Sequence, residues 1–495
     1  MGSDWIDCEL GDLIELKRGY DLPKTKRVNG GVPVVSSSGS SGEHNEIKVK
    51  APGVVTGRYG TIGEVFYIED DFWPLNTTLY VKDFKGNDPL YVYYFLKTIR
   101  YSDYTDKGAV PGINRNHIHK AKVKVPVDPV HQRNLALKLF DLDKKIELNQ
   151  KTNQTLEQMA QALFKSWFVD FDPVFDNLLA SVDFKLENLE TSLPDELKQK
   201  AQRRLAALNS LHNAAECKAS LSALAHELQA QLPTKEATKK ATQSAVQVSE
   251  KAAETPVKAN LNANPNILAQ HANTHAHFPN EFEHHEQLGW IPKGWNIRKL
   301  SSFSEILNGF AFKSGDYIES GNFVLRTKNF KGNEVKKATD DVYLPDEFMT
   351  SHNKYLSQPF DYHLVMVGAS VGKCAIIYPH NLPALRNQNM WCFRTKKDSG
   401  VEQSFIKYML DRLVSKSLGL ASGSAREFFR KGDFGNQEVC IGTNNIQNLF
   451  HVLCGEYLDK MSKNSAQVEV LTKLRDTLLP KLISGELQIP DVAIG

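Results

Sequence analysis

The chain repeats its own beginning 290 residues later. Trp5 corresponds to Trp295, Gly19 to Gly309 and Tyr20 to Phe310, without a gap. Three further pairs keep the same offset: Leu10 with Leu300, Leu13 with Phe303, and Glu15 with Glu305. Because a long internal repeat reflects one structural plan used more than once, the two halves should fold alike.

Later landmarks follow in the same order. The runs 54–63 and 364–372 each predict a buried strand that ends in a glycine turn, and 75–80 parallels 386–391 as a polar lead into an apolar strand. The runs 108–110 and 423–425 precede basic turns with Arg115 and Arg430. We therefore predict two β-rich domains, at residues 1–130 and 290–442.

Each β-rich half is followed by apolar residues at alternating steps of four and three, which predicts a long helix with a heptad seam. The first seam consists of Leu135, Leu139, Leu142, Ile146, Asn149, Asn153, Leu156, Ala160, Leu163 and Trp167. The second consists of Ile446, Phe450, Leu453, Tyr457, Lys460, Asn464, Gln467, Leu471, Leu474, Leu478 and, one position late, Leu482.

The two seams are apolar at their ends and polar in the middle. A buried polar layer fixes helix register, so we predict that helices at 131–175 and 443–495 pair with each other. A helix of about 38 residues is about 57 Å long and extends beyond any domain of this size. The alternative is two amphipathic helices, each packed on its own domain.

Residues 176–289 differ in composition from both halves. This Ala/Gln-rich segment predicts helical pieces at about 193–232 and a mobile linker at 233–279. The segment ends in five histidines, but no cysteine or acidic framework at ligand spacing accompanies them, so no metal site is expected. Those histidines are His271, His275, His277, His284 and His285.

Composition narrows the class of protein. Of 495 residues, 41% are hydrophobic and 24% charged, which is typical of a globular protein of several domains. Because no apolar stretch reaches about 18 residues and the start is acidic, we expect a cytoplasmic protein without a membrane span. The six cysteines are scattered and should be free thiols. The net charge of +2 does not itself indicate a nucleic-acid binder.

No catalytic motif is evident. We find no phosphate-binding G-x-x-x-x-G-K-[ST] loop, no glycine-rich cofactor loop and no Asn-Pro-Pro-aromatic motif of adenine methyltransferases. Glu15-Leu16-Lys17 matches part of a nuclease pattern, but its repeat counterpart, Glu305-Ile306-Leu307, has lost the lysine. We therefore expect no catalytic residue in this chain.

Four segments closely resemble type I restriction-modification specificity subunits. QALFKSWFVDFDP (161–173), preceded by LDKKIELN (142–149), is similar to the central region of that family. LTKLRDTLLPKLISGEL (471–487) is similar to the distal region, and WIPKGW (290–295) to the start of a second target-recognition domain. Together with the repeat, the resemblance covers the chain except for the insert.

The resemblance implies an α+β protein with two mixed α/β target-recognition domains, joined by two long antiparallel coiled-coil helices in a pseudo-two-fold repeat. Each domain would read one half of a split double-stranded DNA sequence, and the helices would measure the spacer. Two methyltransferase and two restriction subunits would be partners and would use S-adenosylmethionine, ATP and Mg²⁺; this chain would need no cofactor. A coiled-coil adaptor with two domains for non-DNA ligands is the alternative.

Arginine, lysine, amide and hydroxyl side chains supply most contacts to DNA phosphates and base edges, so polar residues beside glycine turns are our DNA-binding candidates. Surface ion pairs and turn capping are the alternative roles for such side chains. Family members often carry Gly-Ser-Ala-Gln where this chain has 423–426, which leaves the bases near that turn open. The candidates are Arg58, Tyr59, Thr61, Asn76, Thr77, Asn114, Arg115, Ser370, Lys373, Arg386, Asn387, Gln388, Arg426 and Arg430.

Overall fold

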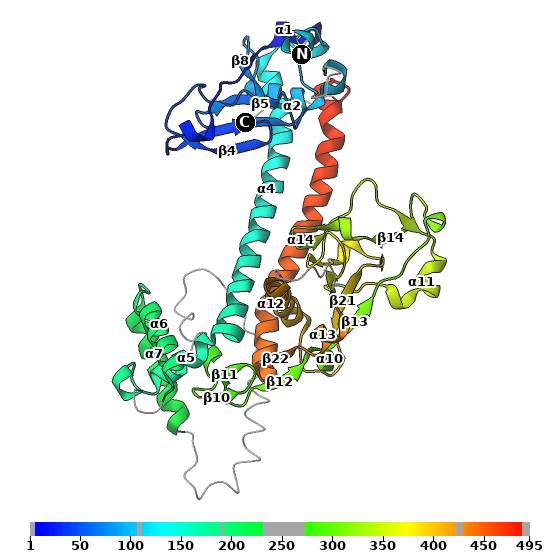
Figure 1. Ribbon diagram of the computed structural model, residues 1–495. Coiled ribbons are helices and arrows are strands. Elements are labelled where there is room, and N and C mark those ends of the chain that lie inside the picture. Colours follow the sequence, from blue (N-terminus) through cyan, green and yellow to red (C-terminus); the bar gives the residue numbers. More distant parts are fainter. Residues whose placement is uncertain (1–4, 106–110, 190–192, 231–272, 422–428, 488–495) are drawn as a thin grey trace, which may run out of the picture. The chain divides into compact units, whose positions relative to one another are not determined.

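The computed structural model describes residues 5–105, 111–189, 193–230, 273–421 and 429–487. The chain forms two compact units, which we describe separately (Figure 1). Unit 1 comprises residues 1–152 and 464–495, and unit 2 comprises residues 153–463. Each unit therefore contains one β-rich domain and part of each of the two long helices. The division of the sequence into two domains, two helices and an insert stays a prediction.

The domain of unit 1 is built on two small sheets. The first is antiparallel in the order β2-β8-β5-β6, and the second has the order β4-β3-β7, with β3 and β7 parallel. Strand β5, GVVTG, is buried throughout, because neighbouring strands pair with both of its edges. The strands are β2 (Glu15–Arg18), β3 (Val32–Ser36), β4 (Gly39–His44), β5 (Gly53–Gly57), β6 (Val65–Ile68), β7 (Trp73–Pro74) and β8 (Thr78–Asp83).

A second layer closes this domain. Strand β1 (Trp5–Glu9) pairs antiparallel with β9 (Lys122–Pro126), which brings the two ends of the domain together. Helix α2 (Pro89–Thr98) begins where Asp88 accepts a hydrogen bond from the Tyr91 amide, and its apolar face is buried. The short elements are α1 (Leu10–Leu13), η1 (Lys24–Lys26), η2 (Tyr101–Tyr104) and α3 (Arg115–Ile118).

Unit 2 repeats this topology. Strands β13-β21-β18-β19 follow the order of β2-β8-β5-β6, β14 and β20 are parallel like β3 and β7, and β12 pairs with β22 as β1 does with β9. The predicted duplication is therefore confirmed. The elements are β12 (Asn296–Lys299), α10 (Leu300–Phe303), β13 (Ser304–Asn308), β14 (Asn322–Leu325), β18 (Tyr362–Val365), β19 (Cys374–Ile376), β20 (Ala384–Arg386), β21 (Met390–Thr395), α12 (Gln403–Ala421), α13 (Lys431–Gly435) and β22 (Glu438–Ile441).

The second domain has an insertion that the first lacks. Val35 of β3 lies opposite Pro74, and Leu325 of β14 lies opposite Arg386. Leu325 is therefore the counterpart of Val35, at the sequence offset of 290. By β5 and β18, where Thr56 matches Leu364, the offset has become 308, so 18 residues are added between these strands. The longer segment between β14 and β18, which we call the insertion, contains η6 (Thr327–Asn329), β15 (Phe330–Lys331), β16 (Glu334–Val335), β17 (Tyr343–Leu344), α11 (Glu347–Ser351) and η7 (Asn353–Tyr355).

Helices α4 (Pro129–Lys165) and α14 (Asn444–Ile483) both pass from one unit to the other. In unit 1 they pack side by side and antiparallel, since Asp143 binds Arg475 (Oδ1 to Nη1, 2.8 Å) and Asn149 contacts Gln467 (Figure 1). The Tyr94 hydroxyl of α2 also donates to Asp143 (2.7 Å), which attaches the domain to the helix pair.

Unit 2 contains the other ends of both helices. The Asn153 amide donates to the Met461 carbonyl oxygen (3.0 Å), and Phe164 lies against Phe450 with 5.9 Å between ring centroids. Lys407 of α12, which is 2% exposed, binds Glu157 of α4 at 2.5 Å. The contacts run antiparallel in this unit as well.

The heptad seam is buried unevenly. Leu135, Leu139, Ile146, Asn149 and Trp167 are buried. Leu142, Asn153, Leu156, Leu163, Leu471 and Leu478 are half-buried. In α14 the seam residues Ile446 and Phe450 are fully buried, and Asn464 farther along the helix is buried as well. Between them the buried positions are Cys454, Leu458 and Met461, next to the half-buried seam residues Leu453 and Tyr457.

Of the predicted seam, Lys460 and Gln467 are exposed, and Leu474 is the clear error among the apolar positions. It is 44% exposed, because α14 turns the side of Arg475 and Leu471 toward α4 at this level. The second helix also ends at 483, and the first at 165, where a π-helical turn (Ser166–Asp170) leads to Phe171 with a positive φ of 59°. Trp167 thus lies in this turn and not in the regular helix.

The insert after α4 is partly helical, as its composition indicates. It contains α5 (Asp172–Ala180), η4 (Leu186–Asn188), α6 (Asp195–Asn209) and α7 (Ala214–Ala230), and a hairpin of β10 (Phe282–His285) and β11 (Gly289–Pro292) follows it. Much of the predicted linker, like His271, lies outside the described residues. Its last part does not behave as a linker, because His275 and Phe278 are buried.

A buried ionic cluster fixes that last part of the insert. Asp176 is 0% exposed and receives two hydrogen bonds from Arg204, both 2.7 Å, and one contact from His275 Nε2 at 3.0 Å. Asn177 donates to the carbonyl oxygens of His275 and Phe278.

Among the described helices, none is both long and apolar enough to cross a bilayer.

Candidate nucleic-acid interface

Three segments of the first domain meet at the loop between β5 and β6. The amides of Arg58 and Tyr59 donate to the Thr77 carbonyl oxygen (2.9 and 3.2 Å), and the Ile113 amide donates to the Arg58 carbonyl oxygen (3.1 Å). These backbone bonds bring predicted residues from three distant parts of the sequence to one place. Asn114 follows Ile113 directly and therefore lies at the same junction.

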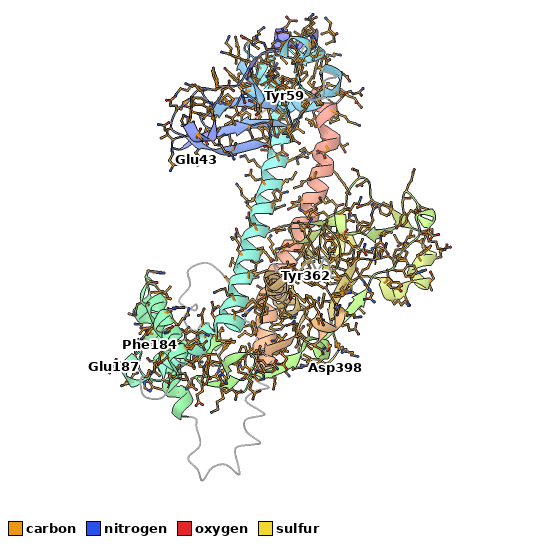
Figure 2. The ribbon with its side chains drawn as sticks, in the orientation of Figure 1. Glu43, Tyr59, Phe184, Glu187, Tyr362 and Asp398 are labelled. Atoms are coloured by element: carbon orange, nitrogen blue, oxygen red, sulfur yellow. The ribbon has the colours of Figure 1, made fainter. Side chains whose placement is uncertain are left out.

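Arg58 and Tyr59 form a pair of side chains in this loop. The Arg58 guanidinium lies 4.5 Å from the centroid of the Tyr59 ring, and both side chains are partly exposed (Figure 2 labels Tyr59). The ring packs on Gly112, where an added Cβ would lie 2.2 Å from a ring carbon. A guanidinium stacked on a held aromatic ring can contact phosphates or bases with little further ordering.

The remaining candidates of the first domain also stabilise its turns. Thr61 donates to the Ser37 carbonyl oxygen, Asn76 donates to Asp21, and Thr77 Oγ1 accepts from the Ser37 amide at 3.4 Å. Asn114 caps α3 by accepting from the Asn116 amide at 3.0 Å. Arg115 is exposed. Capping, the alternative role for such residues, is thus present at Asn114, whereas Thr61, Asn76 and Thr77 join loops that are far apart in the sequence.

Ser37 is a residue that sequence reasoning missed. It lies at the tip of the β3–β4 hairpin and contacts both Thr61 and Thr77. The run Ser36-Ser37-Ser38-Gly39 between two strands is a turn signal that could have indicated it.

The second domain has the equivalent junction. The Met366 amide donates to the Asn389 carbonyl oxygen (3.1 Å) and the Phe429 amide to the Met366 carbonyl oxygen (2.9 Å). In the loop after β18, Gly368 and Gly372 have φ values of 87° and 84°, a region that glycine adopts readily. Ser370 lies between these two glycines, and the exposed Lys373 directly follows the second.

The strand register corrects the sequence alignment by one residue. Tyr80 of β8 pairs with Lys17, and Cys392 of β21 pairs with Leu307, the counterpart of Lys17. Cys392 is therefore the counterpart of Tyr80, at an offset of 312, whereas the sequence match used 311. Asn76 therefore corresponds to Gln388, and Pro74 to Arg386.

Arg386 is consequently a strand residue and not a loop residue. Its side chain is 0% exposed and donates to the carbonyl oxygens of Leu356 (2.5 Å) and Lys354 (2.7 Å). Burial lowers the pKa of Arg386 from its usual value. A side chain enclosed in this way cannot reach a base or phosphate, so the prediction of Arg386 as a DNA contact is wrong.

The next residues are placed differently. Asn387 is half-buried and its side-chain oxygen accepts from the Gln388 amide at 2.7 Å, while the Gln388 side chain is exposed. Arg430 is also exposed, whereas Arg426 and the turn 423–425 lie outside the described residues, as does 108–110 of the first domain.

One cluster in the second domain has the residue types of a metal site. Asp361, His363 and Cys392 bring ligand atoms within 4.8 Å of one another. However, both Asp361 oxygens bind Arg394 (2.8 and 2.5 Å), and burial raises the pKa of the Cys392 thiol well above its usual range. The cation already present is an arginine, so we treat this cluster as structural.

The nuclease-like Glu15-x-Lys17 pattern lies on the surface of β2. Glu15 binds Lys82 (2.9 Å), and the Lys17 ammonium lies 5.6 Å from the centroid of the Tyr20 ring. Cross-strand pairing accounts for this glutamate.

Comparison with known proteins agrees with the duplicated domain. The family model described as the type I restriction modification DNA specificity domain matches residues 2–158 and again 292–450. The chain therefore belongs to the type I restriction-modification DNA specificity family. It is a specificity subunit, and subunits of this kind recognise DNA without being catalytic.

Individual relatives are distant. The HindI specificity subunit of Haemophilus influenzae is 24% identical over 77% of this chain and 72% of its own length. The MjaIX specificity subunit of Methanocaldococcus jannaschii is 21% identical over 81% of this chain and 70% of its own. The crystal structure of the S subunit from M. genitalium, 13% identical, aligns over 97% of this chain and 96% of its own with a TM-score of 0.53, which supports the fold.

Proposed function

We propose that this chain selects a split double-stranded DNA sequence, with one half read by each recognition domain. The observation that carries this proposal is the repeated junction of three backbone segments around Arg58 and Met366. The framework is the same in both domains, while the side chains on it differ: an arginine–tyrosine pair in the first, and Lys373 and Gln388 in the second. Two unlike half-sites require such a combination.

The base- and phosphate-contacting residues proposed here are Arg58, Tyr59, Thr61, Asn76, Thr77, Asn114, Arg115, Ser370, Lys373, Asn387, Gln388, Arg426 and Arg430. Exposed arginine and lysine side chains suit phosphates, and amides suit adenine edges in the major groove.

The two long helices would set the unread spacer and bind methyltransferase subunits. Helix α4 has 37 residues, about 55 Å of helix. Its surface in unit 1 carries exposed Leu148, and α14 carries exposed Val470 and Leu474. Exposed apolar side chains on a helix surface favour a protein partner.

Two methyltransferase subunits and, through them, two restriction subunits would complete the assembly. S-adenosylmethionine, ATP and Mg²⁺ would bind in those subunits. The adaptor alternative has no specific observation in its favour, since the matched family is a DNA specificity family.

Sequencing of methylated bases tests the proposal. Cells that express the chain together with a type I methyltransferase subunit from the same organism should contain a split, adenine-methylated motif that disappears when the chain is deleted. A methylation pattern unaffected by the deletion, or the absence of a methyltransferase from affinity-purified chain, would contradict it.

Substitution of Gln388 by alanine refines the test. If Gln388 reads a base, binding should weaken by about 1–3 kcal/mol for one half of the motif only. Asn448→Ala, which removes an exposed amide side chain from α14, is the matched control and should leave binding unchanged.

A further inference from the structure

The buried Arg386 joins strand β20 to the insertion of the second domain. Its two terminal nitrogens donate to the carbonyl oxygens of Lys354 and Leu356, which flank Tyr355 at the end of η7. The Ser357 amide donates to the Ala384 carbonyl oxygen at 2.9 Å. The segment after α11 is thus attached to β20 from both the side chain and the backbone.

An aromatic cluster holds the same segment from its other side. The His352 ring lies 4.9 Å from Phe310 and 4.9 Å from Phe348, and the Tyr355 ring lies 5.0 Å from Phe310, all between centroids. These four rings are half-buried, and their mutual contacts restrict the positions that a short 3₁₀ turn can adopt. Segment η7 is therefore attached to the domain by these ring contacts as well as by the hydrogen bonds to β20.

This segment adjoins the candidate DNA-binding loop. Phe310, which contacts η7, also forms a β-bridge with Asn387, and Arg386 is covalently continuous with Asn387 and Gln388. The Lys354 side chain is exposed, lies 5.1 Å from the Tyr355 ring centroid, and has no acidic partner among the described residues. Lys328 of the same insertion, by contrast, binds Asp340 and Asp341.

We propose that η7 is an additional DNA-contacting segment of the second domain, in which Lys354 binds a phosphate and Arg386 is the positioning residue that holds it beside Gln388. The proposal rests on the proposed function and adds a contact that the first domain lacks, since Pro74 takes the place of Arg386 there. Burying a guanidinium is costly unless its donors are satisfied. The carbonyl oxygens of Lys354 and Leu356 satisfy its two terminal nitrogens, whereas its Nε is buried without a partner among the described residues.

The test uses the full chain in complex with its methyltransferase subunits. The probe is a duplex of about 30 base pairs that carries the motif found by methylated-base sequencing, titrated at several salt concentrations. Lys354→Ala should weaken binding to a similar extent whatever the bases of the second half-site, and should reduce the slope of log K against log salt by about one.

Lys397→Ala is the matched control. Lys397 is exposed and lies beyond the far end of β21 from Gln388, a strand of six residues or about 20 Å. Figure 2 labels its neighbour Asp398, which lies on a side of unit 2 away from α11. Affinity and salt slope should stay at the wild-type values in this variant.

Arg386→Lys separates positioning from folding. If Arg386 acts through η7, Arg386→Lys should weaken DNA binding in the wild-type chain but hardly at all in the Lys354→Ala variant. The two substitutions would then be non-additive, which a purely structural role of Arg386 would not produce. If the Arg386 variant fails to fold, Lys354→Ala with its control decides alone.

Wild-type affinity and salt slope in Lys354→Ala would overturn the inference. If Gln388→Ala still weakens binding to one half-site in that case, the proposed function stands without it. The absence of any split methylated motif would instead contradict the proposed function itself.

Discussion

Asn149 of α4 donates from Nδ2 to Oε1 of Gln467 of α14 at 2.8 Å, and it is 4% exposed while Gln467 reaches solvent. This bond lies in the polar middle of the helix pair, where apolar side chains would allow several registers. A buried amide with a matched partner on the facing helix favours one register at some cost in stability.

Replacing Gln467 with alanine should therefore destabilise the protein by about 1–3 kcal/mol, because the buried Asn149 amide loses its acceptor. Gln467→Glu keeps an acceptor at the same position and should cost much less. Chemical denaturation of both variants measures the difference. Equal stability of the alanine variant and the wild type would mean that water replaces Gln467.

Removal of Arg204 should disrupt the insert. Asp176 is fully buried; burial raises its pKa, but hydrogen bonds from Arg204 and His275 outweigh this and leave the pKa below its usual value. Arg204→Ala leaves a buried carboxylate with His275 alone, which should cost about 3 kcal/mol. Arg203→Ala, one residue earlier and exposed, is the control. Thermal unfolding and limited proteolysis of the insert would detect the change, and identical curves for both variants would refute it.

His363 should make the second domain sensitive to mild acid. Burial lowers the pKa of His363 to about 4, with Asp361, Arg386 and Arg394 as its charged neighbours. The unfolded chain binds a proton near pH 6.5 and the folded chain does not, so stability is complete above pH 6.5 and declines as the pH falls toward 4. The loss approaches about 3 kcal/mol.

Unfolding free energies measured between pH 7 and pH 4 check this expectation. The unfolding free energy of His363→Gln should fall less between pH 7 and pH 4 than that of the wild type, because this histidine no longer takes up a proton on unfolding. The comparison holds whatever the substitution does to stability at pH 7. A decline of the same size in the variant would assign the acid sensitivity to other groups.

Val470 and Leu474, 64% and 44% exposed, lie four residues apart and so share one face of α14. If that face binds a methyltransferase subunit, the double change to aspartate should abolish co-purification of that subunit while the thermal unfolding of the isolated chain stays close to wild type. The matched control changes the exposed Gln150 and Gln154 of α4, which are also four residues apart, to aspartate. Retained co-purification in the Val470/Leu474 variant would place the partner elsewhere.

The duplication and the two long helices could be predicted from the sequence. Trp5 begins β1 and Trp295 directly precedes β12, and these two strands pair with the equivalent strands β9 and β22. The steps of four and three residues in 135–167 and 446–478 become α4 and α14. These features depend on local periodicity and on matched landmarks, which are properties of the chain itself.

Tertiary structure decided which polar residues are available to a ligand. Arg386 and Gln388 are two residues apart and looked equivalent in sequence, yet the strand pairing of β20 with β14 buries the first and leaves the second exposed. The direction of Leu474 and the burial of His275 were decided in the same way, by neighbours far along the chain. Periodicity along a sequence determines which face of an element a residue occupies, but only the packed partner determines whether that face meets protein or solvent.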